Sequence, residues 1–150
     1  MRFPGIFGVA LGVGIFVATW CVVRWRTPAD AYDFEPKEGF FERILPIYLD
    51  IAKFIMGLAA GGIVLIVGSS AVRSTGRLPV FYAAPLFLLA MSIFYGSLLM
   101  PLLVSDYEAF RHGTHTYSGP RYVRNQALGY SSIACFCLGY GWLIWAAVAG

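Results

Sequence analysis

The stretch Phe54–Val72, FIMGLAAGGIVLIVGSSAV, carries no charged residue and decides the fold class of this chain. Its length is close to the roughly 20 residues that a helix needs to cross about 30 Å of hydrocarbon. Glycine and alanine recur along it, and small residues let helix backbones approach closely in lipid, where no hydrophobic effect drives them together. We therefore expect a transmembrane helix with a face suited to receive another helix.

Three more apolar runs lie around Ile6–Val23, Phe81–Val104 and Ala127–Ala149. Hydrophobic residues make up 59% of the chain and charged residues 13%, against about 25% charged residues in soluble domains. The runs are continuously apolar, whereas the strands of a membrane barrel alternate apolar and polar residues. The sequence thus predicts an all-α polytopic membrane protein, a four-transmembrane-helix bundle forming a single membrane domain over 1–150. The predicted spans are approximately 5–24, 51–73, 79–104 and 125–149.

The segment before the second span predicts an interfacial amphipathic helix. Pro36 is suited to start it, and apolar residues then recur at helical spacing from Phe40 to Ala52. A straight helix from Pro36 to Val72 would be about 55 Å long, and only about 30 Å of it fits in hydrocarbon. We therefore expect a bend between Pro46 and Asp50, with the first half of the segment lying on the membrane surface.

Small residues predict the helix contacts. Gly8 and Gly12 form a G-x-x-x-G on the first span, and Ser92 and Gly96 form a similar small pair on the third. On the second span the small residues from Gly57 fall within about 100° around the helix, which predicts a docking groove for a neighbouring helix or another molecule. The predicted helix-packing positions are Gly8, Gly12, Gly57, Gly61, Gly68, Gly96 and Gly139.

The loop predicted between the third and fourth spans contains His112-Gly-Thr-His115. Two imidazoles near Asp106 or Glu108 are of the type that binds a transition metal. Gly113, however, favours an irregular loop, and a catalytic zinc needs three protein ligands. We therefore predict neither a metal nor a cofactor, and keep His112 and His115 only as weak candidates for metal ligands.

Arg121 and Arg124 precede the predicted last span, with Tyr122 between them. Guanidinium groups match the geometry of phosphate, so both arginines are candidates for binding a lipid head group or another anionic ligand. Asp50 is added to them because its loop emerges on the same side of the membrane. The alternative is that the arginines only anchor the helix at the interface.

The residues inside the spans limit the functional classes. No ionisable residue lies well inside any apolar run, which argues against a transporter or a proton relay. The chain has no C-x-x-C for thiol-linked redox chemistry, and its formal charge of +3 is too scattered for binding nucleic acid.

Two hypotheses follow. In the first, the protein acts through helix packing, as an accessory or structural subunit of a membrane complex or as a homo-oligomer. Its partners are then membrane lipids and other membrane subunits, or itself. In the alternative, it binds a lipid or a small apolar ligand, or is an enzyme, with a polar site at the face that carries loops 25–50 and 105–124. Whether it is an enzyme stays open.

Basic residues bear on the orientation. The side with the long loops holds more arginine and lysine than the opposite side, which holds Arg2, Arg73 and Arg77. By the positive-inside rule the long loops are cytoplasmic, in the plasma (inner) membrane.

Overall fold

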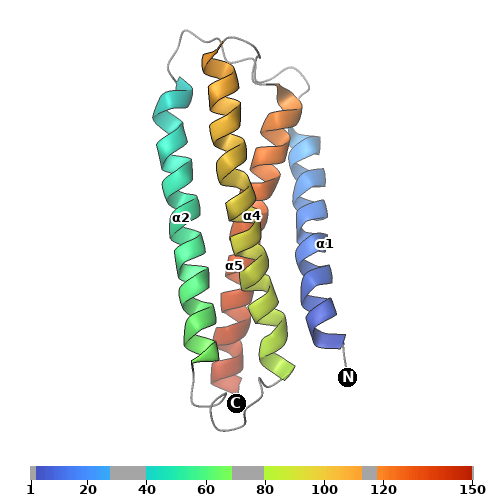
Figure 1. The fold of residues 1–150 in the computed structure, drawn as a ribbon. Coiled ribbons are helices and arrows are strands. Elements are labelled where there is room, and N and C mark those ends of the chain that lie inside the picture. The colour runs from blue at the N-terminus through green and yellow to red at the C-terminus, as the bar shows by residue number, and fades with distance from the viewer. Residues whose placement is uncertain (1–2, 28–39, 69–79, 113–117, 150) are drawn as a thin grey trace.

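A computed structural model of the chain describes residues 3–27, 40–68, 80–112 and 118–149. Four helices make up nearly all of these residues (Figure 1): α1 (Phe3–Arg26), α2 (Phe40–Val67), α4 (Val80–Arg111) and α5 (Gly119–Ala149). Successive helices alternate in direction, and each is long and apolar enough to cross a membrane. The protein is an all-helical membrane protein built as a four-helix bundle, as the sequence predicts.

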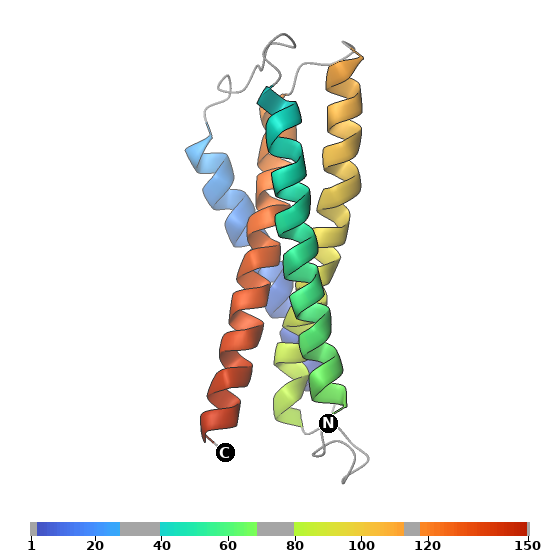
Figure 2. The same cartoon turned by 90° about the vertical axis from the view of Figure 1, so that its left-hand side faces the viewer.

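α4 and α5 form the central pair and share the most extensive helix–helix interface. α1 packs against both of them, and α2 packs mainly against α4 and over a smaller area against α5. α1 and α2 therefore lie on different sides of the central pair, as the two views in Figures 1 and 2 show. This arrangement leaves α2 and α5 less closely joined than any other neighbouring pair described.

α4 and α5 extend beyond the spans expected from the sequence at the ends that face each other. α5 begins at Gly119, where the Ser118 carbonyl accepts the N–H groups of Arg121 (3.0 Å) and Tyr122 (3.1 Å) and so caps the helix. Pro120 fits in this first turn, where its missing N–H costs no hydrogen bond. α4 runs through Pro101 to Arg111, because a spanning helix tolerates proline where neighbouring helices hold it in place.

α2 is one continuous helix from Phe40 to Val67, with Pro46 inside it. The separate interfacial helix expected before the second span is not confirmed: from Phe40 onward the segment forms the first turns of α2, and Pro36 lies outside the described residues. Pro46 removes only one hydrogen bond, near the start of the helix. Leu45 and Leu49, on either side of it, pack against the core of the bundle and keep these turns in place.

The core joins α2, α4 and α5, and polar contacts link the helices within it. Ser92 of α4 and Ser132 of α5 each donate a hydrogen bond to the other's backbone carbonyl, at 2.8 and 2.9 Å. Thr19 of α1 and Ser131 of α5 are joined by a hydrogen bond of 2.6 Å. The buried core cluster consists of Ala52, Leu88, Tyr95, Leu99, Leu103, Leu128 and Cys135.

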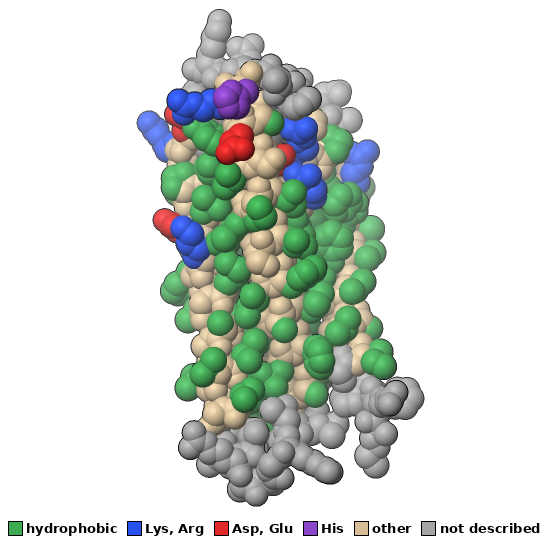
Figure 3. Space-filling view, viewed as in Figure 1, with side chains coloured by type: hydrophobic (Ala, Val, Ile, Leu, Met, Phe, Trp, Pro, Cys, Tyr) green, Lys and Arg blue, Asp and Glu red, His purple; other side chains and the backbone are tan. Residues whose placement is uncertain are grey.

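The charges of the described residues are concentrated at one end of the bundle. Figure 3 shows the charged side chains of one face gathered toward its upper end. This end holds the last turns of α1 and α4 and the first turns of α2 and α5. α4, with 32 residues, is about 48 Å long, which exceeds the hydrocarbon thickness of about 30 Å. The charged turns of α4 therefore extend into the head-group region.

Candidate functional site

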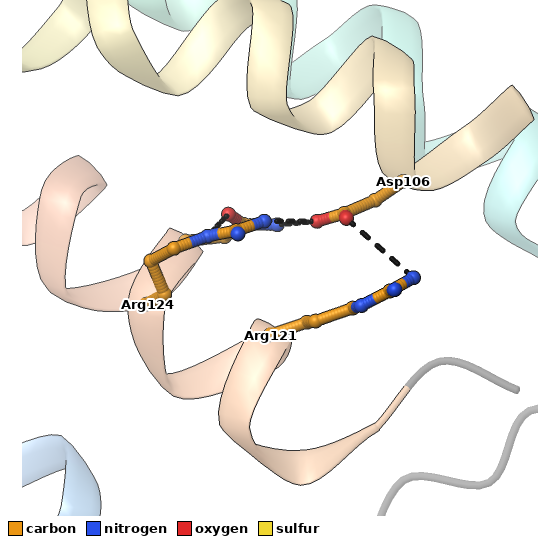
Figure 4. Close-up of polar contacts among 4 residues, drawn as sticks. Asp106, Arg121 and Arg124 are labelled. Carbon is orange, nitrogen blue, oxygen red and sulfur yellow. Dashed lines mark hydrogen bonds and ion pairs between the residues drawn. The ribbon is translucent and has the colours of Figure 1, made fainter. Parts of the chain in front are cut away.

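A carboxylate lies at the centre of a polar cluster at the charged end, which we call the Asp106 cluster: Asp106, Arg121, Arg124 and Asn125 (Figure 4). Asp106 Oδ2 accepts hydrogen bonds from Arg124 Nη2 (2.7 Å) and Asn125 Nδ2 (2.8 Å). Arg121 Nη1 lies 3.8 Å from Asp106 Oδ1. Arg124 Nε also donates to Asn125 Oδ1 at 3.2 Å, which holds the guanidinium in place.

The early start of α5 creates this cluster. Positions 121, 124 and 125 are three and four residues apart, so they share one face of the helix, and that face is turned toward Asp106 of α4. The sequence analysis considered Asp106 only as a neighbour of the two histidines, and Asn125 was not among its candidates. The i, i+3, i+4 spacing would have identified Asn125 only if the helix had been expected to begin at residue 119.

The cluster has more positive than negative charge. One carboxylate, whose side chain is only 7% exposed, faces two guanidinium groups that are 31% and 34% exposed. Arg124 is hydrogen-bonded to the carboxylate, whereas Arg121 at 3.8 Å makes an ion pair that is longer than a hydrogen bond. The cluster therefore joins α4 to α5, and the four side chains that form it carry a net charge of one positive unit.

A groove of about 210 Å³, which we call the first groove, opens beside the cluster between α2, α4 and α5. Its walls are mostly aliphatic, and it runs along α2 from Ile44 to Ile55, about 16 Å of helix. Asn125 lines the groove and also binds Asp106, so the apolar groove is continuous with the charged cluster. Its polar lining residues are Tyr48, Tyr122, Asn125, Gln126, Tyr130 and Ser132.

Small residues along the groove and a polar contact below it explain why this groove exists. Ala52 of α2 and Gly129 of α5 both line it, and neither has a side chain large enough to fill it. Below the groove the Tyr140 hydroxyl donates to the Leu58 carbonyl at 2.9 Å. Gly62 permits this contact, because a Cβ there would lie 2.6 Å from the hydroxyl oxygen.

A second groove, of about 410 Å³, lies between α1 and α5. Tyr122, Gln126 and Tyr130 line both grooves, and we call these three residues the α5 ridge. They are four residues apart and therefore project from one face of α5. Tyr130 is 54% exposed, so the ridge faces outward between α1 and α2. From α1, the second groove is lined by Ala18, Thr19, Val22, Val23, Arg26 and Thr27.

Four of the predicted packing glycines face neighbours within the bundle. A Cβ would lie 2.8 Å from the Phe87 side chain at Gly8 and 2.9 Å from the Met91 side chain at Gly12. The corresponding distances are 2.8 Å to Met56 at Gly96 and 3.0 Å to Leu89 at Gly139.

The other three predicted glycines lie at or beyond the outer face of α2. Gly57 and Gly61 are exposed, and a Cβ at either position would meet no atom within 4 Å. Gly68 follows the last residue of α2, and a Cβ there would meet only the Val64 carbonyl of the same chain segment. The glycine of α2 that faces α5 is instead Gly62, the residue after Gly61, which lies against Tyr140.

Asp50 and His112 lie apart from the cluster and the grooves. Asp50 forms an exposed ion pair with Lys53, at 3.8 Å along α2. His112 is exposed just after α4, and His115 lies outside the described residues. Within the part of the chain that the structure describes, no three His, Cys, Asp or Glu side chains are placed to hold a metal ion. The possibility of a metal site at the two histidines stays a prediction.

Comparisons with protein-family models, with curated proteins and with solved structures found no match to this chain.

Proposed function

We propose that this protein binds a lipid-like amphiphile from the bilayer in the first groove, with the polar part of the ligand toward the Asp106 cluster. The observation that carries this proposal is Asn125, which lines the apolar groove and also binds the buried Asp106. Concave, mostly apolar sites with a few converging polar groups are typical of small-ligand binding. The polar lining consists of phenols, amides and a hydroxyl, which orient a ligand by hydrogen bonds.

The structure favours this hypothesis over the one based on helix packing alone. That hypothesis rests on more small-residue faces than a single bundle needs. Four of the seven predicted glycines, however, face neighbours within the chain. Ligand binding in the first groove requires no additional small-residue faces. The groove also lies toward the end of the bundle that carries loops 25–50 and 105–124, where the polar site was expected.

Filling the groove tests the proposal. Leucine at Gly129 would occupy the groove, and its Cβ fits, since the nearest atom is Leu99 Cδ2 at 3.6 Å. Gly141→Leu is the matched control, because it is also on α5 and a Cβ there meets no atom within 4 Å. We expect lipid that copurifies with the wild type, measured by native mass spectrometry, to be lost from Gly129→Leu and retained by Gly141→Leu. Equal retention by both variants would contradict the proposal.

A second candidate function is assembly through the outer face of α2. Gly57 and Gly61 form a G-x-x-x-G that is exposed on the bundle surface, and this spacing lets two helices approach closely in a membrane. We propose a second copy of this chain as the partner, since two identical glycine faces are complementary to each other across a two-fold axis.

The test of assembly uses Gly61→Leu, with Gly14→Leu on α1 as the control that also meets no atom within 4 Å. The mass of the complex in mild detergent should fall to that of one chain for Gly61→Leu only. A mass that is unchanged would remove this candidate, and a different copurifying subunit would replace the second copy as the partner.

For the orientation, we propose that the charged end is cytoplasmic, in the plasma (inner) membrane. Most of the described basic residues, including Arg24, Arg26, Arg43 and Arg111, lie in the terminal turns at that end, and Lys53 lies further along α2. This distribution fits the positive-inside rule. An enzyme reporter that is active only outside the cytoplasm, fused after residue 150, should then be active. An inactive reporter would reverse the orientation.

A further inference from the structure

We propose that the ligand is a two-chain lipid with an anionic head group, which straddles the α5 ridge with one acyl chain in each groove. This inference rests on the proposed function, because it specifies the amphiphile bound in the first groove. It adds a second binding surface, the groove between α1 and α5.

The shared lining of the two grooves is the first argument. Tyr122, Gln126 and Tyr130 line both grooves, so the grooves are separated only by the side chains of one helix face. The acyl chains of a two-chain lipid leave adjacent carbons of one backbone, so they need two apolar channels that begin side by side. A single-chain amphiphile would use only one of them.

Each groove provides an apolar wall for a chain. Leu45, Ile55 and Ile133 line the first groove, and Val22 and Val23 line the second. α1 and α2 lie on either side of the ridge and make few contacts with each other, so among the described helices the outer edge of the ridge at Tyr130 stays exposed.

The polar groups of the ridge match the region of a lipid between head and chains. Within the described residues, Gln126 Nε2 makes one hydrogen bond, at 3.4 Å to the Tyr48 hydroxyl, and an amide nitrogen carries two N–H groups. The Tyr130 hydroxyl belongs to a side chain that is 54% exposed. An ester carbonyl of a lipid accepts hydrogen bonds from such donors.

Among the described residues, positively charged side chains lie beside both grooves. Arg26 lines the second groove and is exposed, and the Asp106 cluster has one carboxylate for two guanidinium groups. Arginine binds phosphate oxygens with two parallel hydrogen bonds. The head group is therefore a phosphate that keeps a net negative charge, rather than a zwitterionic one.

The test compares three lipids added to the delipidated full-length protein in detergent: phosphatidylglycerol, phosphatidylcholine with the same two chains, and one-chain lysophosphatidylglycerol. Native mass spectrometry gives the bound fraction of each. We expect phosphatidylglycerol to bind about tenfold more tightly than either of the others, which corresponds to about 1.4 kcal/mol. Equal binding of the one-chain lipid would overturn the two-groove arrangement, and equal binding of phosphatidylcholine would overturn the anionic head group.

Two variants with matched controls test where the second acyl chain and the lipid head group bind. Ala18→Phe fills the second groove, whereas Ala10→Phe places the same ring at an exposed position of α1 outside it. Ala18→Phe should remove the preference for two chains and leave the binding of the one-chain lipid unchanged. Arg26→Gln should remove most of the preference for phosphatidylglycerol over phosphatidylcholine, and Arg24→Gln should not.

The outcomes separate this inference from the proposed function. If Ala18→Phe has no effect while Gly129→Leu abolishes binding, the second chain is not in the second groove, but the first groove still binds lipid. If Gly129→Leu has no effect on any of the three lipids, the proposed function fails, and this inference fails with it. A polypeptide that copurifies and protects Tyr130 from chemical modification would show that the ridge binds a helix instead.

Discussion

The two seams that α5 forms with α4 and with α2 differ in how closely the helices approach. Along the α4–α5 seam, Gly139 meets Leu89, Ser92 and Ser132 exchange hydrogen bonds, and the Asp106 cluster closes the charged end. Along the α2–α5 seam, described contacts at Tyr48 and Tyr140 bracket a groove. Small residues allow close packing in lipid when a neighbouring side chain fills the space that they leave. Leu89 fills that space opposite Gly139, whereas at Ala52 and Gly129 the space stays open as a groove.

We call the α4–α5 seam the closed seam and the α2–α5 seam the open seam. Disrupting the Asp106 cluster, at the charged end of the closed seam, should have the largest effect on the free energy of unfolding. Asp106→Ala leaves Arg124 without its carboxylate, and removing one partner of a buried ion pair typically costs about 3–5 kcal/mol. Arg124 is 34% exposed, and its hydration reduces the cost, so we expect a loss near the low end of that range, about 3 kcal/mol. Unfolding in sodium dodecyl sulfate measures the change. Glu42→Ala, which removes an exposed pair between α2 and α4, should cost much less, and an equal cost would show that the cluster is not a structural pin.

Placing a large side chain in the middle of the α4–α5 seam, at Gly139, should have the next largest effect on the free energy of unfolding. At Gly139 even a Cβ would lie 3.0 Å from Leu89 and 3.3 Å from the Pro85 carbonyl, so leucine forces the two helices apart. Overpacking of this kind costs about 1–3 kcal/mol. Gly141→Leu, on the exposed side of the same helix, should leave the unfolding free energy unchanged within about 0.5 kcal/mol. A similar loss of unfolding free energy in both variants would mean that leucine destabilises α5 at any position, and would not support close packing at Gly139.

Removing a serine from the closed seam should have a moderate effect. Ser92→Ala deletes the hydrogen bond to the Ser132 carbonyl, and interhelical hydrogen bonds of this type in membranes contribute about 0.6 kcal/mol on average and at most about 1.7. Ser97→Ala, which loses only a bond within its own helix, is the control. The two hydroxyl oxygens also lie 3.3 Å apart. The double variant Ser92→Ala/Ser132→Ala should therefore be less destabilised than the sum of the two single variants.

Loosening the open seam should have the smallest effect on stability and a clearer effect on binding. Tyr140→Phe deletes the hydrogen bond to the Leu58 carbonyl, and we expect it to lower the unfolding free energy by less than about 1 kcal/mol. Because this contact holds α2 to α5 below the groove, bound lipid should exchange faster, which a competition experiment with labelled lipid measures. Slower or unchanged exchange would show that the contact does not control the width of the groove.

The candidate site was only partly predictable. Arg121 and Arg124 were singled out by their position before a span, but their common partner Asp106 depends on how far α4 and α5 extend. Pro101 lies near the end of the third predicted span, and residues 118–120 lie in the predicted loop 105–124. The structure continues α4 through Pro101 to Arg111 and starts α5 at Gly119. Local residue preferences do not decide such ends when neighbouring helices support the backbone.

The sequence by itself determined that the chain lies in lipid, that it is helical, and that it has four apolar spans. Uncharged runs of this length satisfy their backbone hydrogen bonds in lipid only as helices. Only the tertiary structure decided which side of each helix faces inward. In a soluble helix the polar face shows this, but here lipid and core are both apolar, so the periodic signal is weak. Gly61 and Gly62 differ by one position on α2, and only the contact with Tyr140 shows that Gly62 is the inner one.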